Sequence, residues 1–553
     1  MKASDLFLRC LEAEGVKTIF GVPGEENADL MISLLDSPIE FIICRHEQAA
    51  AFMADMYGRV TGKPGVCLST LGPGTTNLLT GVASANMDHS PLVAIVGQTS
   101  TRRMHKESHQ MMDSISMFKP VTKWATTVRD SDNIPEVVRK AFKLATVEKP
   151  GATVIELPED IARGNSDEKP MIPTFSNPEG GVKPYLVKRA LDIIRAADTP
   201  LILLGNGCSR DCASEQITRL IDQTGIYAVS TFMGKGVLSD RHKQSLFAVG
   251  LGLNDIVTEA FEQADLVICI GYDMVEWPPA RWNIGKPKRI IHIDTQAAEV
   301  DNKYPVTLDI VGSILETVNA FNEQLTCPIP TKTPQFEALR TRISIDLSEF
   351  DNDTSFPVKP QRIISDMRAV LRDDDILISD VGVHKLWVAR DYKTYLPRTT
   401  IITNGFCSMG ISLPGAIAAK KEFPAKNVVA LCGDGGFLMN VQDLITAVRY
   451  KIPITVVIWN DNCYGMIKWK QTLTYCKSSN VDLVNPDFVM LAKSFGCRGI
   501  QISSADQFRP ALQEAFSHTD CPTVIAVPID YDQNIELAKK MGGYHCPLDP
   551  AKK

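Results

Sequence analysis

The sequence predicts an α/β protein of three domains, each a mostly parallel sheet flanked by helices. The first observation is length, because 553 residues exceed what one hydrophobic core usually serves and indicate about three domains. The second is alternation: short apolar runs rich in β-branched residues recur along the chain, separated by segments with helical periodicity. Short apolar runs without polar alternation are typical of buried parallel strands.

The apolar runs fall into three blocks, which we predict as domains 1–165, 184–328 and 360–540. Polar stretches with proline and glycine, at 163–183 and 328–360, are predicted to be the linkers. The first and last blocks share a pattern, an α/β sheet with a glycine turn near one edge, as a duplication would leave. The predicted strands are 18–21, 41–44, 65–69, 92–96 and 153–157, then 201–205, 266–271 and 289–294, and finally 376–380, 427–431 and 454–459.

The composition is that of a globular protein, with 44% apolar residues and a mean hydropathy of −0.03. A net charge of −7 argues against nucleic acid or an anionic membrane as the main partner. No apolar run approaches the roughly 18 residues of a spanning helix, and the first residues lack the uncharged core of a signal peptide. We therefore expect a soluble, cytoplasmic protein. The 14 cysteines form no CxxC pair or His/Cys cluster, which argues against zinc and favours reduced thiols.

Two aspartates, Asp434 and Asp461, stand 27 positions apart, and each follows a short apolar run. Residues 441–450 between the runs are predicted to be the crossover helix of a βαβ unit, which puts both strand ends at the same edge of the sheet. Two carboxylates, the glycines of the GDGG sequence and a following helix N-terminus suit Mg²⁺ together with a diphosphate. The alternative is a pair of ordinary turns between strand and helix.

Two further features lie in the first block. Glu47 follows the predicted strand 41–44 and opens a helix, and the turn 71–77, LGPGTTN, joins a strand to another helix. A glutamate in a first helical turn commonly serves capping and the helix dipole. Many glycine turns are structural too, so neither feature alone establishes a site.

Together, Glu47 within RHEQAAAFMADMYGRVTGKPGV, the LGPGTTN turn and GDGG followed by ND resemble the thiamine diphosphate (ThDP) enzymes of the acetohydroxyacid synthase and pyruvate oxidase superfamily. The resemblance covers nearly the whole chain, with the motifs in family order. It implies a pyrimidine-binding domain at 1–165, a central Rossmann-like domain at 184–328 and a diphosphate-binding domain at 360–540. It also implies sites shared between subunits, hence a homodimer at least, with a homotetramer as the expected form.

The resemblance implies a catalytic role for Glu47, whose carboxyl group would hydrogen-bond the pyrimidine N1′ and relay a proton through the ring. It implies Mg²⁺ ligation by Asp434, Asp461 and the Cys463 carbonyl, although many relatives have asparagine where Asp461 stands. Met409 would support the bent cofactor. The residues implied to contact ThDP are Gly24, Pro73, Asn77, Val381, Gly382, Val383, His384, Cys407, Met409, Gly433, Asp434, Gly435, Gly436, Asp461, Tyr464 and Gly465.

The middle block indicates which reaction follows. Its segment 271–279, GYDMVEWPP, resembles the catabolic acetolactate synthases, and the Arg-Phe-Asp-Asp-Arg stretch usual in FAD-binding relatives is absent. This resemblance implies that two molecules of pyruvate, a small 2-keto acid, give 2-acetolactate and CO₂, with ThDP and Mg²⁺ and without FAD. It implies a substrate site formed by His109, Gln110 and Met466, with Trp469 nearby. Core packing is the alternative for Met466 and Trp469, and an ordinary surface position for His109.

Several alternatives stay open at this stage, chiefly another ThDP-dependent decarboxylase or carboligase of 2-keto acids, or pyruvate oxidase. Glyoxylate carboligase is disfavoured because its family lacks the glutamate that Glu47 supplies. A non-catalytic homologue is disfavoured because Glu47, Asp434 and Asp461 are all present. The glycines of 205–207 are only a partial dinucleotide fingerprint. Glu25 and Glu26 leave the substrate open, because carboxylates at short range would repel a keto-acid carboxylate.

Overall fold

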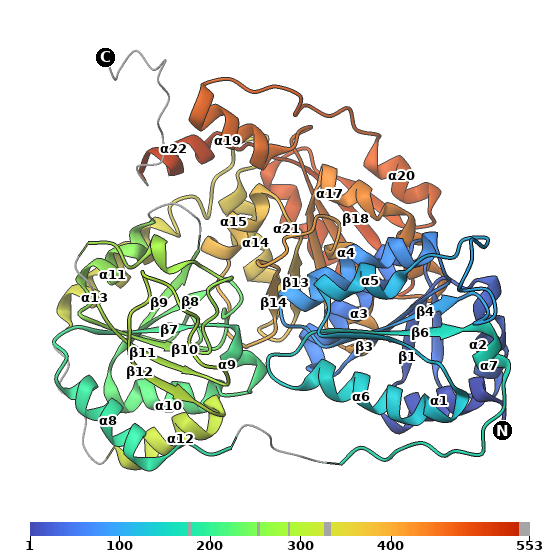
Figure 1. Ribbon diagram of the computed structural model, residues 1–553. Coiled ribbons are helices and arrows are strands. Elements are labelled where there is room, and N and C mark those ends of the chain that lie inside the picture. Colours follow the sequence, from blue (N-terminus) through green and yellow to red (C-terminus); the bar gives the residue numbers. More distant parts are fainter. Residues whose placement is uncertain (175–179, 251–254, 286–287, 326–332, 541–553) are drawn as a thin grey trace.

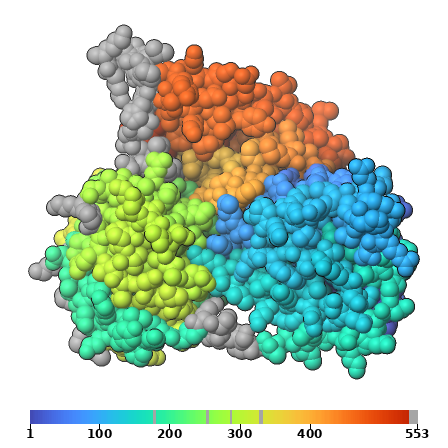
Figure 2. All heavy atoms as spheres, viewed as in Figure 1, coloured from blue at the N-terminus to red at the C-terminus, as the bar shows by residue number. Residues whose placement is uncertain are grey.

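The computed structural model describes residues 1–174, 180–250, 255–285, 288–325 and 333–540 (Figure 1). These residues form three domains, each built on a six-stranded sheet whose neighbouring strands are all parallel. Helices pack against the sheets, so the predicted α/β fold of three domains is confirmed. Figure 2 shows the three domains as adjoining lobes of one surface. Among the described helices, none combines the length and apolar character that a membrane crossing requires.

The first sheet has the order β2-β1-β3-β4-β6-β5. Successive residues of a strand face opposite sides, so Val66 and Leu68 of β3 enter one hydrophobic core while Cys67 enters the other. The strands are β1 Thr18–Gly21, β2 Glu40–Ile43, β3 Gly65–Ser69, β4 Leu92–Gln98, β5 Trp124–Thr127 and β6 Ala152–Pro158. The helices are α1 Ala3–Ala13, α2 Ala28–Ser33, α3 Glu47–Thr61, α4 Pro73–Met87, α5 Ser114–Phe118, α6 Ile134–Thr146 and α7 Glu159–Arg163.

The middle sheet has the order β12-β11-β10-β7-β8-β9, the strand order of a dinucleotide-binding fold. Its strands are β7 Pro200–Leu204, β8 Tyr227–Thr231, β9 Ser245–Val249, β10 Leu266–Ile270, β11 Arg289–Asp294 and β12 Val306–Val311. Its helices are α8 Pro184–Arg195, α9 Asn206–Arg210, α10 Ser214–Thr224, α11 Glu259–Gln263, α12 Ile314–Gln324 and α13 Pro334–Asp346. Helix α13 falls within the stretch predicted to be a linker, and its Phe336, Leu339 and Ile343 enter the core of this domain.

The third sheet has the order β14-β13-β15-β16-β18-β17. Its strands are β13 Ile376–Ser379, β14 Thr400–Ile402, β15 Val428–Gly433, β16 Thr455–Asn460, β17 Arg498–Gln501 and β18 Thr523–Pro528. Its helices are α14 Pro360–Val370, α15 Val383–Asp391, α16 Ser412–Glu422, α17 Asp434–Met439, α18 Leu444–Arg449, α19 Gly465–Tyr475, α20 Phe488–Ser494, α21 Phe508–Ser517 and α22 Gln533–Lys540. The predicted crossover helix at 441–450 is α18, preceded by a 3₁₀ turn and by α17.

The first and third sheets share one topology. Numbered within its own domain, each sheet runs second, first, third, fourth, sixth, fifth strand. In both, the strand order reverses between the first and third strands, which is where open α/β sheets bind ligands beyond their carboxyl ends. The shared topology is what a duplication would produce. It places the glycine turns after β1 and β3, and those after β13 and β15, at equivalent edges.

The first and third domains pack together through α3 and α16 and share one hydrophobic core. The contact is close, because a Cβ at Gly415 of α16 would stand 2.8 Å from Met56 Cε of α3. Polar contacts add to it: the amide of Ile43 donates to the Tyr450 hydroxyl at 2.9 Å, and that of Arg45 to Asp443 Oδ1 at 3.0 Å.

Eleven cysteines of the described residues are free thiols, as the composition predicts. Cys476, at the end of α19, is an exception to the expected reduced state, because it is disulfide-bonded. In the described ranges, no group of three or more histidine, cysteine, aspartate or glutamate side chains could hold a metal ion. A metal site built on two carboxylates and a backbone carbonyl, as the sequence predicts, is compatible with that finding.

Candidate cofactor site

A cavity of about 360 Å³ lies at the carboxyl edge of the third sheet, beyond the strand ends of β13, β15 and β16. This edge is the switch point of the sheet, where the topology predicts a ligand site. Its lining is formed by Val381, Gly382, Val383, His384, Lys385, Leu386, Cys407, Met409, Gly433, Asp434, Gly435, Gly436, Asp461, Cys463, Tyr464, Gly465, Met466, Ile467 and Tyr531. The predicted residues from Val381 to Met466 therefore come together in one cavity, although the sequence scatters them over four segments.

Asp434 and Asp461 occupy adjacent strand ends. Each follows the last residue of its strand, and Gly433 of β15 is the register partner of Trp459 of β16. Burial raises the pKa of Asp461 to about 6, and the charge of Asp434 adds to the rise. Burial likewise raises the pKa of Asp434. Asp434 is buried and Asp461 half-buried, and a hard divalent cation between two such carboxylates would stabilise their charged forms.

The surroundings of the two carboxylates differ. Asp434 Oδ1 accepts from the Gly435 amide at 2.8 Å, and Oδ2 accepts from Asn485 Nδ2 at 2.7 Å. Asp461 Oδ2 accepts from Cys463 Sγ at 2.9 Å. The Cys463 carbonyl, predicted to be a metal ligand, accepts from the Gly465 amide at 2.9 Å. A carbonyl oxygen has a second lone pair, so this bond is compatible with ligation.

Three helices start at the cavity: α15 at Val383, α17 at Asp434 and α19 at Gly465. The free N–H groups and the dipole at a helix start attract anions. Glycine is required beside Asp461, because a Cβ on Gly465 would stand 2.8 Å from Asp461 Oδ2. The cavity thus combines two carboxylates that could hold a cation with free backbone N–H groups that could bind phosphate oxygens.

His384 is buried in the cavity wall with its ring edge-on to Trp459. Burial lowers its pKa to about 4, so the imidazole is neutral at physiological pH. Its Nε2 atom is buried and has no hydrogen-bond partner within the described residues. An unpaired buried nitrogen beside this cavity is a position where a ligand oxygen would restore the missing bond.

The structure adds residues that the sequence did not predict. Asn485, from the loop between α19 and α20, bonds Asp434, and no pattern in its surroundings indicates this role. Asp380 accepts from the Gly410 amide at 2.8 Å and the Ser412 amide at 3.0 Å, which fixes the turn carrying Cys407 and Met409. Lys385 lies in the cavity lining. A lysine inside the run HKLWV is a sequence signal for a buried charge, which the prediction passed over.

A second group of predicted residues lies in the first domain and does not line this cavity. Glu47 begins α3 with 9% of its surface exposed, and its Oε2 accepts from Asn77 Nδ2 at 2.9 Å. Pro73 begins α4, four residues before Asn77 on the same helix. Gly24 lies against Thr70, whose hydroxyl donates to Glu26 Oε2 at 2.7 Å. The carboxylate of Glu26 is therefore engaged inside its own domain.

The predicted substrate residues are also divided. His109 and Gln110 are exposed in the loop after β4, with the Gln110 backbone close over Gly72. Met466 lines the cavity and also packs against the core of the third domain. Trp469 is buried one turn further along α19. Both the predicted and the alternative roles of Met466 are thus compatible with its position.

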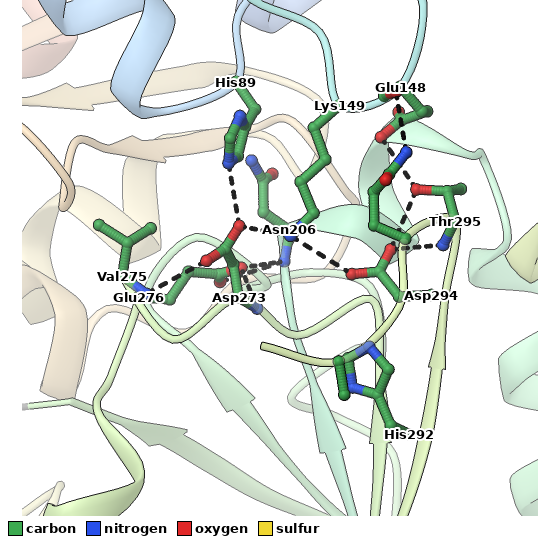
Figure 3. Close-up of polar contacts among 12 residues, drawn as sticks. His89, Glu148, Lys149, Asn206, Asp273, Val275, Glu276, His292, Asp294 and Thr295 are labelled. Carbon is green, nitrogen blue, oxygen red and sulfur yellow. Dashed lines mark hydrogen bonds and ion pairs between the residues drawn. The ribbon is translucent and has the colours of Figure 1, made fainter. Parts of the chain in front are cut away.

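A polar cluster joins the first and middle domains (Figure 3). Lys149 Nζ lies 2.7 Å from Asp273 Oδ2 and 3.7 Å from Asp294 Oδ2, and His89 Nε2 lies 2.9 Å from Asp273 Oδ2. Burial opposes ionisation of Asp273, yet the bond from His89 and the charge of Lys149 hold its pKa below the usual value. These contacts fix the middle domain against the first.

Glu276, in the loop after β10, is buried beside this cluster and contacts the first residue of α9 (Figure 3). Both of its carboxylate oxygens accept from the Asn206 amide at 3.1 Å, and the Thr231 hydroxyl donates to Oε2. Burial raises the pKa of Glu276 to about 8. The turn between β7 and α9, where a dinucleotide-binding fold receives a pyrophosphate, is thus occupied by a side chain of the protein.

The fold and the cavity define a protein of three α/β domains with a cavity at the carboxyl edge of the third sheet, lined by two carboxylates and three helix starts. Comparison with known families agrees with this class. Residues 1–117 match the N-terminal TPP binding domain of thiamine pyrophosphate enzymes, 187–321 their central domain and 380–527 their C-terminal TPP binding domain. The chain belongs to the family of thiamine pyrophosphate enzymes.

Relatives align along nearly the whole chain. An acetolactate synthase of Bacillus subtilis is 35% identical over 97% of this chain and 95% of its own length. A catabolic acetolactate synthase of Raoultella terrigena is 36% identical over 98% and 97%. A probable acetolactate synthase large subunit of Methanocaldococcus jannaschii is 36% identical over 96% and 92%.

Proposed function

We propose that the cavity of the third domain holds the diphosphate of ThDP through Mg²⁺. Asp434, Asp461 and the Cys463 carbonyl would ligate the cation, and the helix starts at Val383 and Gly465 would meet the phosphate oxygens. The donor set supports this, because carboxylate and carbonyl oxygens are the ligands that Mg²⁺ prefers. The unpaired Nε2 of His384 supports it too, since a phosphate oxygen would satisfy that atom.

We propose that the enzyme converts two molecules of pyruvate and one proton into 2-acetolactate and CO₂. When bound, ThDP would supply a nucleophilic carbon for the keto carbonyl and an acceptor for the electron pair released with CO₂. The observation that carries the proposal is that Glu47, Asp434 and Asp461 all occur in a chain aligning over 96–98% of its length with proteins named acetolactate synthase.

Glu47 is proposed to hold and move the proton at the pyrimidine N1′ of the cofactor. A carboxyl group needs a sheltered position for this role, and Glu47 has one, fixed by its bond from Asn77. Because Glu47 does not line the cavity of the third domain, we propose that each site joins the first domain of one chain to the third domain of another. The functional unit is then a homodimer at least, with a homotetramer as the expected form.

The proposed substrate residues are His109, Gln110 and Met466. The exposure of His109 and Gln110 in this single chain is compatible with a role at a surface that a second chain completes.

The net charge of −7 and the small substrate support a cytoplasmic enzyme with no nucleic-acid partner.

We propose that the enzyme works without FAD. The Asn206 amide lies where a dinucleotide-binding fold binds a pyrophosphate, and here it donates a hydrogen bond to the carboxylate of Glu276. A pyrophosphate at this position would have to displace the buried side chain of Glu276. A purified protein with no flavin absorbance supports this proposal, and a stoichiometric bound flavin contradicts it.

The reaction is tested with purified protein, ThDP, Mg²⁺ and pyruvate, assayed for CO₂ and for acetolactate as acetoin after acid. We expect one acetolactate for each CO₂. Acetaldehyde alone would favour a decarboxylase, and acetyl phosphate formed with a bound flavin would favour pyruvate oxidase.

A further inference from the structure

Lys385 is a buried cation in the wall of the cofactor cavity. It lies in the first turn of α15, only 7% of its surface is exposed, and it lines the cavity beside Cys407 and Met409. Its ammonium nitrogen is 2.8 Å from Asn404 Oδ1 and 3.0 Å from Cys407 Sγ. An ammonium group has three N–H donors, so these two acceptors leave one donor unassigned.

The charge of Lys385 has no carboxylate counterion among the residues that the structure describes. No carboxylate oxygen of the described residues lies within 4.0 Å of its nitrogen, whereas Lys235, which is also buried, lies 3.8 Å from Asp240 Oδ2. A buried charge is costly unless it is paired. An anion bound in the cavity would supply the missing partner.

Two anions are expected in this cavity under the proposed function: the cofactor diphosphate and the carboxylate of a keto acid. The diphosphate already has a proposed cation, the Mg²⁺ between Asp434 and Asp461. Lys385 is held instead by Asn404 and Cys407, in the segment that follows β14. Asn404 is fixed in turn, because its amide N–H donates to Asp88 Oδ2 and its side chain to the Glu276 carbonyl. The ammonium group therefore has a rigid support remote in sequence from the three proposed metal ligands.

The chemistry distinguishes the two keto acids. The first loses its carboxylate as CO₂, and a cation paired with that carboxylate would stabilise the starting state and slow its departure. The second keeps its carboxylate throughout. A carbon–carbon bond forms to its carbonyl carbon, the carbonyl oxygen gains a proton, and the carboxylate charge persists in acetolactate. A fixed cation therefore assists the second substrate and hinders the first.

We propose that Lys385 binds the carboxylate of the second, accepting keto acid and so directs the reaction to carboligation rather than to release of an aldehyde. This inference rests on the proposed function.

The test compares Lys385→Gln with Lys385→Arg in the enzyme loaded with ThDP and Mg²⁺. Glutamine keeps a donor for Asn404 but removes the charge, and arginine restores the charge. In Lys385→Gln we expect the ratio of acetolactate to acetaldehyde to fall roughly 10- to 100-fold, the range for loss of a charge-assisted hydrogen bond. The rate of CO₂ release should stay within a few-fold, and Lys385→Arg should recover most of the ratio.

The control is Lys235→Gln, which removes a buried lysine paired with Asp240 outside the cofactor cavity and should leave the product ratio unchanged. Binding of ThDP, followed by quenching of tryptophan fluorescence, should be the same in wild type and Lys385→Gln. An unchanged product ratio in Lys385→Gln would overturn the inference. Weakened ThDP binding would overturn it as well, by assigning Lys385 to the diphosphate. Failure of the wild type to make acetolactate refutes the proposed function instead, which separates the two failures.

Discussion

The side-chain amide of Asn485 donates to Asp434 Oδ2 at 2.7 Å. The same nitrogen reaches Asn460 Oδ1 at 3.0 Å and Asn462 Oδ1 at 3.1 Å, so it ties the loop before α20 to the ends of β15 and β16. The amide orients the carboxylate from outside the cavity. Partners of this kind fix the geometry of a ligand and tune its affinity for metal.

Asn485→Ala is expected to weaken Mg²⁺ binding by roughly 10- to 100-fold, because Asp434 loses the group that orients it. The Mg²⁺ concentration giving half-maximal activity measures the effect. Asn480→Ala is the control, since the side chain of this exposed asparagine in the same loop donates to Ser479 Oγ and not to Asp434 among the described residues. An unaltered Mg²⁺ requirement in Asn485→Ala would show that the contact is structural.

Asparagine substitutions at the two carboxylates should have unequal effects. Both oxygens of Asp434 accept hydrogen bonds, so the NH₂ group of Asp434→Asn would face a donor, either the Gly435 amide or Asn485. Asp461 Oδ2 accepts from the Cys463 thiol, and in Asp461→Asn an amide oxygen can still ligate there. We expect Mg²⁺ affinity to fall about tenfold in Asp461→Asn and more than about 100-fold in Asp434→Asn. Titration of Mg²⁺ against ThDP binding checks the order, and equal losses would contradict it.

The strands that were predicted from the sequence lie mostly in the interior of the sheets, and most of the strands that were missed lie at the edges. Runs such as β3, β10 and β16 are buried on both faces and read as continuous apolar segments. Most of the strands that were not predicted are edge strands, namely β5, β9, β12, β14 and β17. Of these, β5, β12 and β17 are partly exposed and β14 has three residues, so their apolar signal is weak, whereas β9 is buried throughout. Helix α13 was not predicted because the segment that leads into it is rich in the prolines and threonines typical of a linker.

In the candidate site, too, some residues could be predicted from the sequence and others could not. Residues at strand ends and helix starts, such as Asp434, Asp461 and His384, follow from local pattern together with the family resemblance. Asn485 and Asp380 act through hydrogen bonds that span 51 and about 30 positions, and such pairing leaves no local pattern. In the proposed homodimer, Glu47 reaches the cavity of the other chain, and such an intermolecular contact leaves no pattern in the sequence.

Glu47→Gln is expected to lower kcat by roughly 10²- to 10⁴-fold, because the amide cannot exchange a proton with the pyrimidine ring. The amide oxygen can still accept from Asn77, so the melting temperature should change little. Exchange of the ThDP C2 proton with D₂O, measured by NMR, should slow in parallel with turnover.

Glu40→Gln provides the control, since this exposed glutamate of β2 pairs with Lys421 at the surface and should keep full activity. Full activity in Glu47→Gln would remove the proton-relay role. Loss of activity with unchanged C2 exchange would move Glu47 to a later step.

Glu276→Gln should change how stability depends on pH. The pKa of Glu276 is raised from 4.5 to about 8 by burial, so the folded state holds this proton more tightly than the unfolded chain does. The stability from this group is fully present below about pH 4.5 and is lost as the pH rises to about 8. Glutamine is neutral throughout, so the variant should match wild type near pH 5. At pH 8 it should melt a few degrees higher, given the size of such linkage effects.

Thermal unfolding at intervals from pH 5 to pH 8.5 measures this difference. Glu262→Gln is a suitable control, because this glutamate is exposed on α11 in the same domain and should show no pH-dependent difference from wild type. A Glu276→Gln variant that is less stable than wild type at pH 8 would indicate an ionised Glu276 whose charge strengthens its bond from the Asn206 amide. In that case the turn between β7 and α9 holds a permanent negative charge, and exclusion of a pyrophosphate would be electrostatic as well as steric.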